Sequence, residues 1–282
     1  MFLTECPRDA MQGWPEPIAT SQKIDYLNAL MTVGFDVLDC GSFVSPRTIP
    51  QMADSATVIE EIDKGVSRTQ LSVIVANVRG AEKALKHQAV DILGFPFSVS
   101  ETFQQRNTNK SREEAYQHIN HIAEMLKEDG RQLNVYFSMA FGNPYGDHWD
   151  VEEIKDWTMK FSDLGIRRIL LSDTTGTGTP EQISEMFTVV PQQFPEVEFG
   201  AHFHNRYEDS YIKLKSAYDA GCRRFDSAIK GIGGCPMAKD ELVGNMPTEQ
   251  VINFMAAEKI DHSLNLLNFE SAYNQAKRIF HF

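Results

Sequence analysis

Short apolar stretches alternate with longer amphipathic segments along almost the whole chain. The short stretches are rich in β-branched and aromatic residues, which predicts strands over residues 2–6, 36–43, 70–77, 89–95, 133–141, 167–173, 197–204 and 223–231. In the segments between them apolar residues recur every three or four positions, which predicts helices. Three of these helical segments end at a glycine, the residue that commonly follows a helix, at Gly34, Gly130 and Gly165.

This alternation predicts an α/β fold with parallel strands. Repeated strand and helix units of this number suggest a closed (β/α)8 TIM barrel, and a chain of 282 residues is long enough to build one. We therefore expect a single catalytic domain over residues 1–282. Its last part, residues 261–282, has the pattern of a helix and predicts a C-terminal helical segment added to the barrel.

Net charge, apolar runs and cysteine spacing limit the partners and the cellular compartment that we expect for this protein. The net charge is −12, and no apolar run reaches the roughly 18 residues of a membrane span, so we expect no nucleic-acid partner and no membrane partner. The four cysteines have no CxxC spacing, and the N-terminus lacks the pattern of a secretory signal. Both features predict a cytoplasmic protein without disulfides.

Ionisable residues gather where the predicted strands end. In TIM barrels the active site is built at the C-terminal ends of the strands. The residues at these ends are Arg8 and Asp9 after the first strand, Asp39 in the second, Asp173 in the sixth, and His202 and His204 in the seventh. The pattern predicts a catalytic site at this face of the barrel.

The two histidines flank Phe203 in the sequence HFH. Side chains alternate along a strand, so both imidazoles should point one way and the phenyl ring the other. Two imidazoles combined with carboxylate and amide oxygens suit a six-coordinate divalent ion such as Mg²⁺ or Mn²⁺. The alternative is a structural role for the histidines, which requires no ion.

Two interpretations also apply to Arg8 and Asp9. Strand alternation would turn the two side chains in different directions. The carboxylate would then be available to a metal ion and the guanidinium to a developing oxyanion. The alternative is a surface ion pair, which is the common fate of such neighbours.

A glycine-rich segment with one cysteine, GIGGCP, follows the eighth predicted strand. It lacks the spacing of a phosphate-binding P-loop, and its glycines suggest a mobile lid. Cys235 is then either an inert small residue or a thiol that acts as acid or base. Earlier in the chain, residues 173–180 predict a turn and a helix start, with Thr179 as cap and Pro180 in the first helical position. Asp173 could instead order the ligand shell.

Several stretches resemble the 3-hydroxy-3-methylglutaryl-CoA (HMG-CoA) lyase family, within a superfamily of metal-dependent acyl-CoA lyases, carboxylate synthases and aldolases. They are PRDAMQ, SFVSPRTIPQMADSATV, SDTTGTGTP, HFH, and GIGGCP followed by GN, in the family's order over nearly the whole chain. The resemblance implies that the metal ligands are Asp9, His202, His204 and Asn245. It also implies the catalytic set Arg8 as enolate stabiliser, Asp9 or His202 as base, Cys235 as acid or base, and Asp39 beside Arg8.

The same resemblance implies a reaction and its partners. The reaction would be the Mg²⁺- or Mn²⁺-dependent cleavage of the acyl-CoA substrate HMG-CoA into acetyl-CoA and acetoacetate, as in leucine degradation and ketone-body formation. We expect a homo-oligomer, a dimer. Residues 104–112 become a candidate for the CoA phosphates, with a solvated loop as the alternative. Other functions stay open: a related lyase, an aldolase or an acetyl-CoA-dependent carboxylate synthase acting on another 3-hydroxyacyl-CoA or 2-oxo acid, or a catalytically silent metal-binding barrel.

The chain departs from the family around the expected substrate. Asp39 stands where the family usually has Glu, Asn205 follows the second histidine where Asp is usual, and MQGW occupies residues 11–14 in place of LQNE. The loop from Cys235 to Asn245 is one residue longer than usual. A lyase with the shorter Asp39 needs a compensating change, and the candidates are Cys40, Gly41, Trp14 and Asn205.

Overall fold

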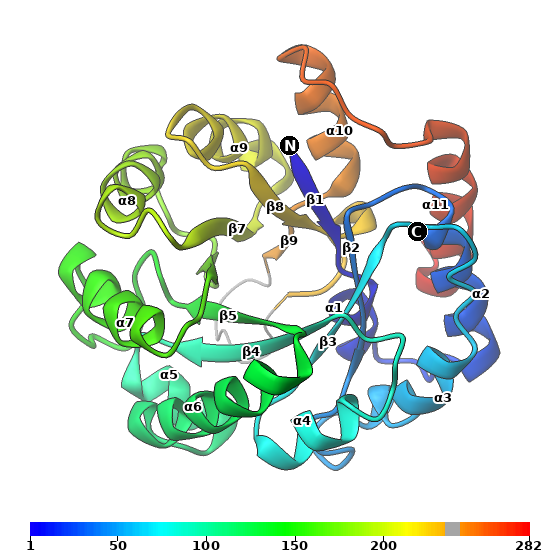
Figure 1. The fold of residues 1–282 in the computed structure, drawn as a ribbon. Helices are drawn as coiled ribbons and strands as arrows, with labels where there is room; N and C mark the ends of the chain where they lie inside the picture. Colours follow the sequence, from blue (N-terminus) through cyan, green and yellow to red (C-terminus); the bar gives the residue numbers. More distant parts are fainter. Residues whose placement is uncertain (235–242) are drawn as a thin grey trace.

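The computed structural model describes residues 1–234 and 243–282, which form a closed barrel of parallel strands surrounded by helices (Figure 1). Strands β1 to β8 pair in chain order, and β8 pairs back with β1 and so closes the barrel. They span Phe2–Glu5, Val37–Ser42, Gln70–Ile74, Ile92–Ser98, Gln132–Ser138, Arg168–Asp173, Glu198–Asn205 and Arg224–Ser227. All eight overlap the predicted strands, and the TIM barrel is confirmed. The last strand is shorter than predicted, because residues 229–231 form a 3-10 turn.

Helices lie outside the strands, and short turns fill the connections. The helices are α1 (Pro7–Gln12), α2 (Thr20–Met31), α3 (Ser55–Glu60), α4 (Val78–Ala84), α5 (Glu101–Thr108), α6 (Arg112–Asp129), α7 (Val151–Asp163), α8 (Pro180–Gln193), α9 (Ser210–Asp219), α10 (Thr248–Ala257) and α11 (Leu266–Phe280). The 3-10 turns are η1 (Pro50–Met52), η2 (Tyr207–Asp209) and η3 (Ile229–Gly231). No helix within residues 1–234 and 243–282 is long and apolar enough to cross a bilayer.

Local sequence signals set where several helices begin and end. Thr179 caps α8 by accepting a hydrogen bond from the backbone of Gln182, and Pro180 takes the first helical position, as predicted. Gly130 ends α6 with a φ of 85°, in the left-handed region that glycine adopts without a steric penalty.

The predicted C-terminal helix is present as α11 and packs beside α2 on the outside of the barrel (Figure 1). Phe280 of α11 makes edge-to-face contacts with Trp14 and Tyr26, with ring centroids 5.1 and 6.1 Å apart. Trp14 follows α1 directly, so the terminal helix supports the segment that begins at the end of β1. This link connects the C-terminus to the face where the ionisable residues lie.

Candidate functional site

Arg8 and Asp9 lie in α1, which starts directly after β1. Arg8 Nη1 is 2.8 Å from Asp9 Oδ1, while its Nε and Nη2 donate to Asp39 Oδ2 at 3.0 and 2.6 Å. The expectation that strand alternation turns Arg8 and Asp9 apart is wrong, because a helical turn brings both side chains into one network. All three residues are buried, so this network is not a surface ion pair.

Asp39 reaches Arg8 directly although it is shorter than the glutamate expected at this position. The pairing of β2 with β3 shifts register between Asp39 and Gly41, which places an irregularity at Cys40. Such bulges re-aim neighbouring side chains. A register shift beside Asp39 is one way in which the shorter side chain could reach Arg8, and its role as the compensating change stays a prediction.

The two histidines point the same way from β7, as predicted. Their ring centroids are 5.4 Å apart, whereas Phe203 packs on Phe141 with centroids 5.7 Å apart. His202 Nδ1 is 3.1 Å from Asp226 Oδ2, and His204 Nδ1 is 3.0 Å from the carbonyl oxygen of Thr174. An oxygen acceptor places the proton on Nδ1, which leaves Nε2 of both rings available to a ligand.

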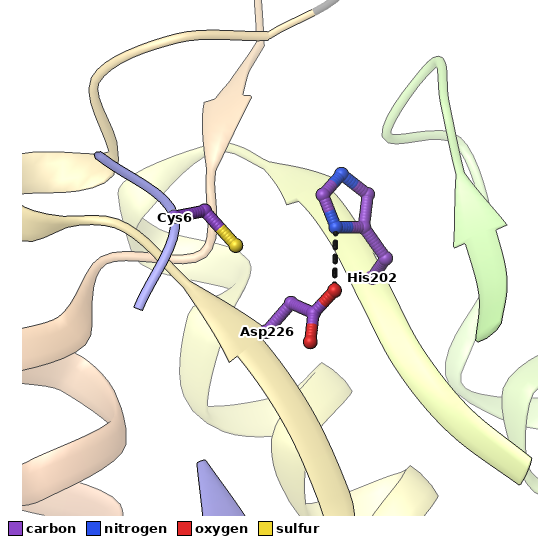
Figure 2. Close-up of side chains that lie close together, drawn as sticks. All are labelled: Cys6, His202 and Asp226. Carbon is purple, nitrogen blue, oxygen red and sulfur yellow. Dashed lines mark hydrogen bonds and ion pairs between the residues drawn. The ribbon is translucent and has the colours of Figure 1, made fainter. Parts of the chain in front are cut away.

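Asp226 on β8 is the partner that fixes the His202 ring, as Figure 2 shows. The Cys6 thiol lies beside this pair, and Cys6, His202 and Asp226 bring donor atoms within 4.8 Å of one another. The Nδ1 atom of His202 already binds Asp226, and burial raises the pKa of Cys6 well above its usual range. The Cys6 sulfur therefore stays protonated, and we do not assign a metal ion to this group.

Asp9, His202 and His204 form a second group whose donor atoms lie within 4.8 Å of one another. Asn245, the fourth expected ligand, belongs to β9 (Gly244–Asn245), which pairs antiparallel with the end of β7. Its Nδ2 donates to Asp9 Oδ2 at 2.7 Å and to the Ile232 carbonyl at 2.9 Å, so its amide oxygen would be the ligand atom. A carboxylate, two imidazole Nε2 atoms and an amide oxygen fit a divalent ion such as Mg²⁺ or Mn²⁺.

The charge states of Asp9 and His204 also fit a cation. Burial alone would raise the pKa of Asp9, but Arg8 and the two imidazoles outweigh it and lower that pKa. Burial, together with the neighbouring His202, lowers the pKa of His204 to about 4. Burial would likewise lower the pKa of His202, yet its hydrogen bond to Asp226 raises it. At neutral pH Asp9 is thus ionised and His204 is neutral, which are the forms that bind metal.

These side chains open into a cavity of about 590 Å³ at the mouth of the barrel. Gly234 lines one side of it. The preceding Gly233 has a φ of +99°, and a Cβ there would lie 2.6 Å from Asn245 Nδ2 and 2.8 Å from the Asp9 carbonyl oxygen. The glycine run thus lets the backbone pass directly over two expected ligands. Cys235 lies outside the described residues.

Residues 104–112 do not form a loop, contrary to expectation. They belong to the end of α5, the left-handed cap Asn109 and the start of α6. Arg106, Asn109 and Lys110 nevertheless line the same cavity as Arg8 and His202. The segment therefore reaches the expected face in a different secondary structure.

Sequence reasoning missed four residues that contact the expected ligands or hold their neighbours. Gln12 donates to Asp9 Oδ1 at 3.0 Å, and Lys213 donates to Asp173 Oδ2 at 2.6 Å. The other two are Asp226 and Thr174. Inward alternation from Arg224 along β8 was a signal for Asp226. A lysine within an amphipathic helix and a backbone carbonyl carry no such signal.

Comparisons with known proteins agree with this geometry. A model of the HMGL-like family matches residues 2–275. The chain is 32% identical to the mitochondrial hydroxymethylglutaryl-CoA lyase of Macaca fascicularis, over 95% of this chain and 82% of that protein. It is 29% identical to a 3-hydroxy-3-isohexenylglutaryl-CoA/hydroxymethylglutaryl-CoA lyase of Pseudomonas aeruginosa, over 92% of this chain and 86% of that one. An HMG-CoA lyase from Acinetobacter baumannii, solved with coenzyme A and 3-methylmalate, superimposes with a TM-score of 0.92 at 30% identity, covering 100% of this chain and 91% of that chain.

Proposed function

This chain belongs to the HMGL-like family, and we propose that it is an enzyme that cleaves HMG-CoA into acetyl-CoA and acetoacetate. The observation that carries the proposal is the gathering of Asp9, His202 and His204 beside Arg8 at one cavity. The resemblance of the sequence to this family, and relatives named for this activity, support the same reaction. A structural role for the histidines is disfavoured, because both rings leave Nε2 free beside an ionised carboxylate.

The site would hold Mg²⁺ or Mn²⁺ through Asp9, His202, His204 and Asn245. When bound, the ion would act as a Lewis acid that acidifies the 3-hydroxyl of the substrate. The protein supplies the remaining groups, and the roles that we propose for them start from their hydrogen bonds. Gln12 and Arg8 both donate to Asp9 Oδ1, which leaves Asp9 Oδ2 facing Asn245.

The chain's own residues carry the proton and charge movements. Asp9 or His202 takes the proton of the 3-hydroxyl. His202 would take it through Nε2 while that atom is not bound to the ion, because its Nδ1–H already donates to Asp226. The bond between C2 and C3 then breaks, so that C3 becomes the ketone of acetoacetate and the electron pair forms the enolate of acetyl-CoA. Arg8 stabilises that oxyanion, and Cys235 delivers a proton to the carbon.

The acyl-CoA would enter along α5. Arg106 and Lys110 are the basic side chains that this segment presents to the cavity, and they would bind the phosphates of CoA. Arg106 also stacks on the ring of Tyr145, 4.5 Å from its centroid, which limits the freedom of the guanidinium. The dimer and the cytoplasmic location stay predictions.

The remaining alternative is an acyl-CoA substrate with a larger group at C3. The relative from Pseudomonas aeruginosa is named for both 3-hydroxy-3-isohexenylglutaryl-CoA and hydroxymethylglutaryl-CoA. The cavity wall includes the apolar side chains of Val44, Ile74 and Phe103, which would accommodate an alkyl group. HMG-CoA is our first choice because Asp39 retains its contact with Arg8.

The test is a product assay on purified protein freed of metal and then supplied with Mg²⁺. We expect HMG-CoA to yield acetyl-CoA and acetoacetate in equal amounts, with kcat/KM in the usual range of about 10⁴–10⁸ M⁻¹s⁻¹. Parallel reactions contain a 3-hydroxyacyl-CoA with a longer C3 chain, or acetyl-CoA with a 2-oxo acid. A value for HMG-CoA several orders of magnitude lower, beside rapid turnover in a parallel reaction, would contradict the proposal.

A further inference from the structure

A lysine lies buried behind the two histidines, outside the set of residues that the reaction uses. Lys213 of α9 is 3% exposed, and its Nζ donates to Asp173 Oδ2 at 2.6 Å and to the Gly176 carbonyl oxygen at 2.8 Å. Burying an ammonium group costs several kcal/mol of solvation unless its partners compensate. The two hydrogen bonds of Lys213 supply this compensation, and they tie the lysine to the residues that accept them.

Lys213 holds the segment between β6 and α8 at two points. Asp173, the last residue of β6, also accepts the backbone N–H of Gly178 at 3.1 Å through the same Oδ2 atom. The Gly176 carbonyl lies between these anchors. Lys213 therefore fixes the start and the middle of residues 173–178, and Asp173 holds their end.

The fixed segment packs directly on His204. The carbonyl oxygen of Thr174 accepts the N–H of His204 Nδ1 at 3.0 Å, and a Cβ at Gly176 would lie 3.1 Å from the His204 carbonyl oxygen. The Thr174 hydroxyl in turn accepts the Met139 backbone N–H at 2.8 Å. Thr174 is thus held on one side by Met139, directly after β5, and on the other by the segment that Lys213 anchors.

We propose that Lys213 is a positioning residue for the metal site. It acts through Asp173, Gly176 and Thr174 to fix the orientation of the His204 ring, and it touches neither the ion nor the substrate. This inference rests on the proposed function for the ligand role of His204. Partners that orient a metal-binding histidine from behind typically change metal affinity by about 10–100-fold when they are lost.

The chain offers a matched control in a second buried lysine. Lys23 of α2 is 2% exposed, and its Nζ likewise contacts one carboxylate, Asp54 Oδ1 at 2.7 Å, and one backbone carbonyl, that of Gln51. Its partners belong to η1 and the start of α3, on the other side of the barrel from α9 (Figure 1). Loss of Lys23 should therefore destabilise the fold in a similar way without moving His204.

The experiment compares Mn²⁺ binding, by calorimetric titration of metal-free protein, among wild type, Lys213→Met and Lys23→Met. We expect the Kd to rise about 10–100-fold in Lys213→Met and to stay at the wild-type value in Lys23→Met. Saturating Mn²⁺ should restore most of the turnover of Lys213→Met, because the chemical groups remain. If both lysine variants bind Mn²⁺ as tightly as wild type while folded, the proposal is wrong.

A folding defect would not hide the answer. Lys213→Gln retains one donor for Asp173 or Gly176, and its Kd should lie between those of wild type and Lys213→Met. If Lys213→Met does not fold, a wild-type Kd in Lys213→Gln overturns the proposal. Wild-type protein that binds no Mn²⁺ would instead overturn the metal site itself, so the two failures are distinguished.

Discussion

At the mouth of the barrel Arg8 lies between Asp39 and Asp9, whereas at the opposite end Arg224 lies between Glu198 and the ring of Phe2. Both arginines are buried. Arg8 bonds to two buried carboxylates. Arg224 shares one half-exposed carboxylate with Arg168, and its guanidinium carbon lies 3.4 Å from the centroid of the Phe2 ring.

The two ends therefore differ in the balance of charge. Two carboxylates pair with the one guanidinium group of Arg8, whereas two guanidinium groups pair with the one carboxylate of Glu198. Burial would lower the pKa of both arginines, but Asp39 and Asp9 reverse this effect at Arg8 and raise its pKa, while that of Arg224 stays lowered. An excess of buried carboxylate favours a divalent cation at the mouth. We assign the contacts of Arg224 at the opposite end to the stability of the barrel.

The largest effect should come from Arg8→Met. The variant removes the guanidinium that we place on the enolate oxygen, so kcat should fall on the order of 10³-fold, as for the loss of an oxyanion-stabilising group. Steady-state kinetics with HMG-CoA and saturating Mg²⁺ measures this, and circular dichroism checks that the barrel is folded. A kcat within threefold of wild type would remove Arg8 from the chemistry.

Asp39→Glu should have the next largest effect. Asp39 is 1% exposed and already contacts Arg8 at 2.6 Å, so an added methylene has to displace the guanidinium. A shift of about 1 Å can cost roughly 10²-fold in rate. A kcat/KM for HMG-CoA that equals or exceeds the wild-type value would show that the site prefers the family's glutamate and that Cys40 compensates nothing.

Arg224→Met tests the opposite end of the barrel. It leaves Glu198 with Arg168 alone and removes the contact with Phe2, so the free energy of unfolding should fall by about 2 kcal/mol. Urea unfolding measures the loss. The kcat should not change, because no proposed ligand contacts Arg224. A tenfold drop in kcat would contradict the claim that this end of the barrel contributes to stability and not to catalysis.

The smallest effect concerns Glu5, whose carboxylate accepts hydrogen bonds from the Ile229 backbone at 2.8 Å and from the Thr248 hydroxyl at 2.5 Å. Burial raises the pKa of Glu5 from 4.5 to about 8. Between these pH values the folded protein keeps a proton that the unfolded chain releases, so its contribution to stability falls as pH rises.

Glu5→Gln abolishes this titration. The variant should be more stable than wild type by about 1 kcal/mol or more at pH 8, and the advantage should shrink towards pH 5. Urea unfolding of both proteins at the two pH values measures it. An equal difference at both values would mean that Glu5 does not titrate in this range.

The sequence predicted the barrel and the family, and both are confirmed. Alternation along β7 also predicted the shared direction of the two imidazoles, because a strand has a period of two residues. The same rule was wrong for Arg8, because the chain turns into α1 one residue after Cys6. The two-residue period of a strand cannot show where β1 ends and α1 begins, although Pro7 in the first helical position was a signal for the start of the helix.

Contacts between distant elements were beyond sequence reasoning. Asp226 lies 24 residues after His202 and reaches it only because β7 pairs with β8. Lys213 lies 9 residues after His204 and is linked to it only through the segment between β6 and α8. The irregularity at Cys40 likewise depends on how β2 pairs with β3. The roles of the catalytic residues and ligands stay predictions.

A calorimetric titration of Mn²⁺ into metal-free wild type and His204→Ala tests the metal centre most directly. The account predicts that wild type binds the ion and that His204→Ala binds it at least about tenfold more weakly, because an imidazole ligand is lost. Arg224→Met serves as the control and should bind as wild type does. Unchanged Mn²⁺ affinity in folded His204→Ala would contradict the assignment of the mouth as a metal site that uses this histidine.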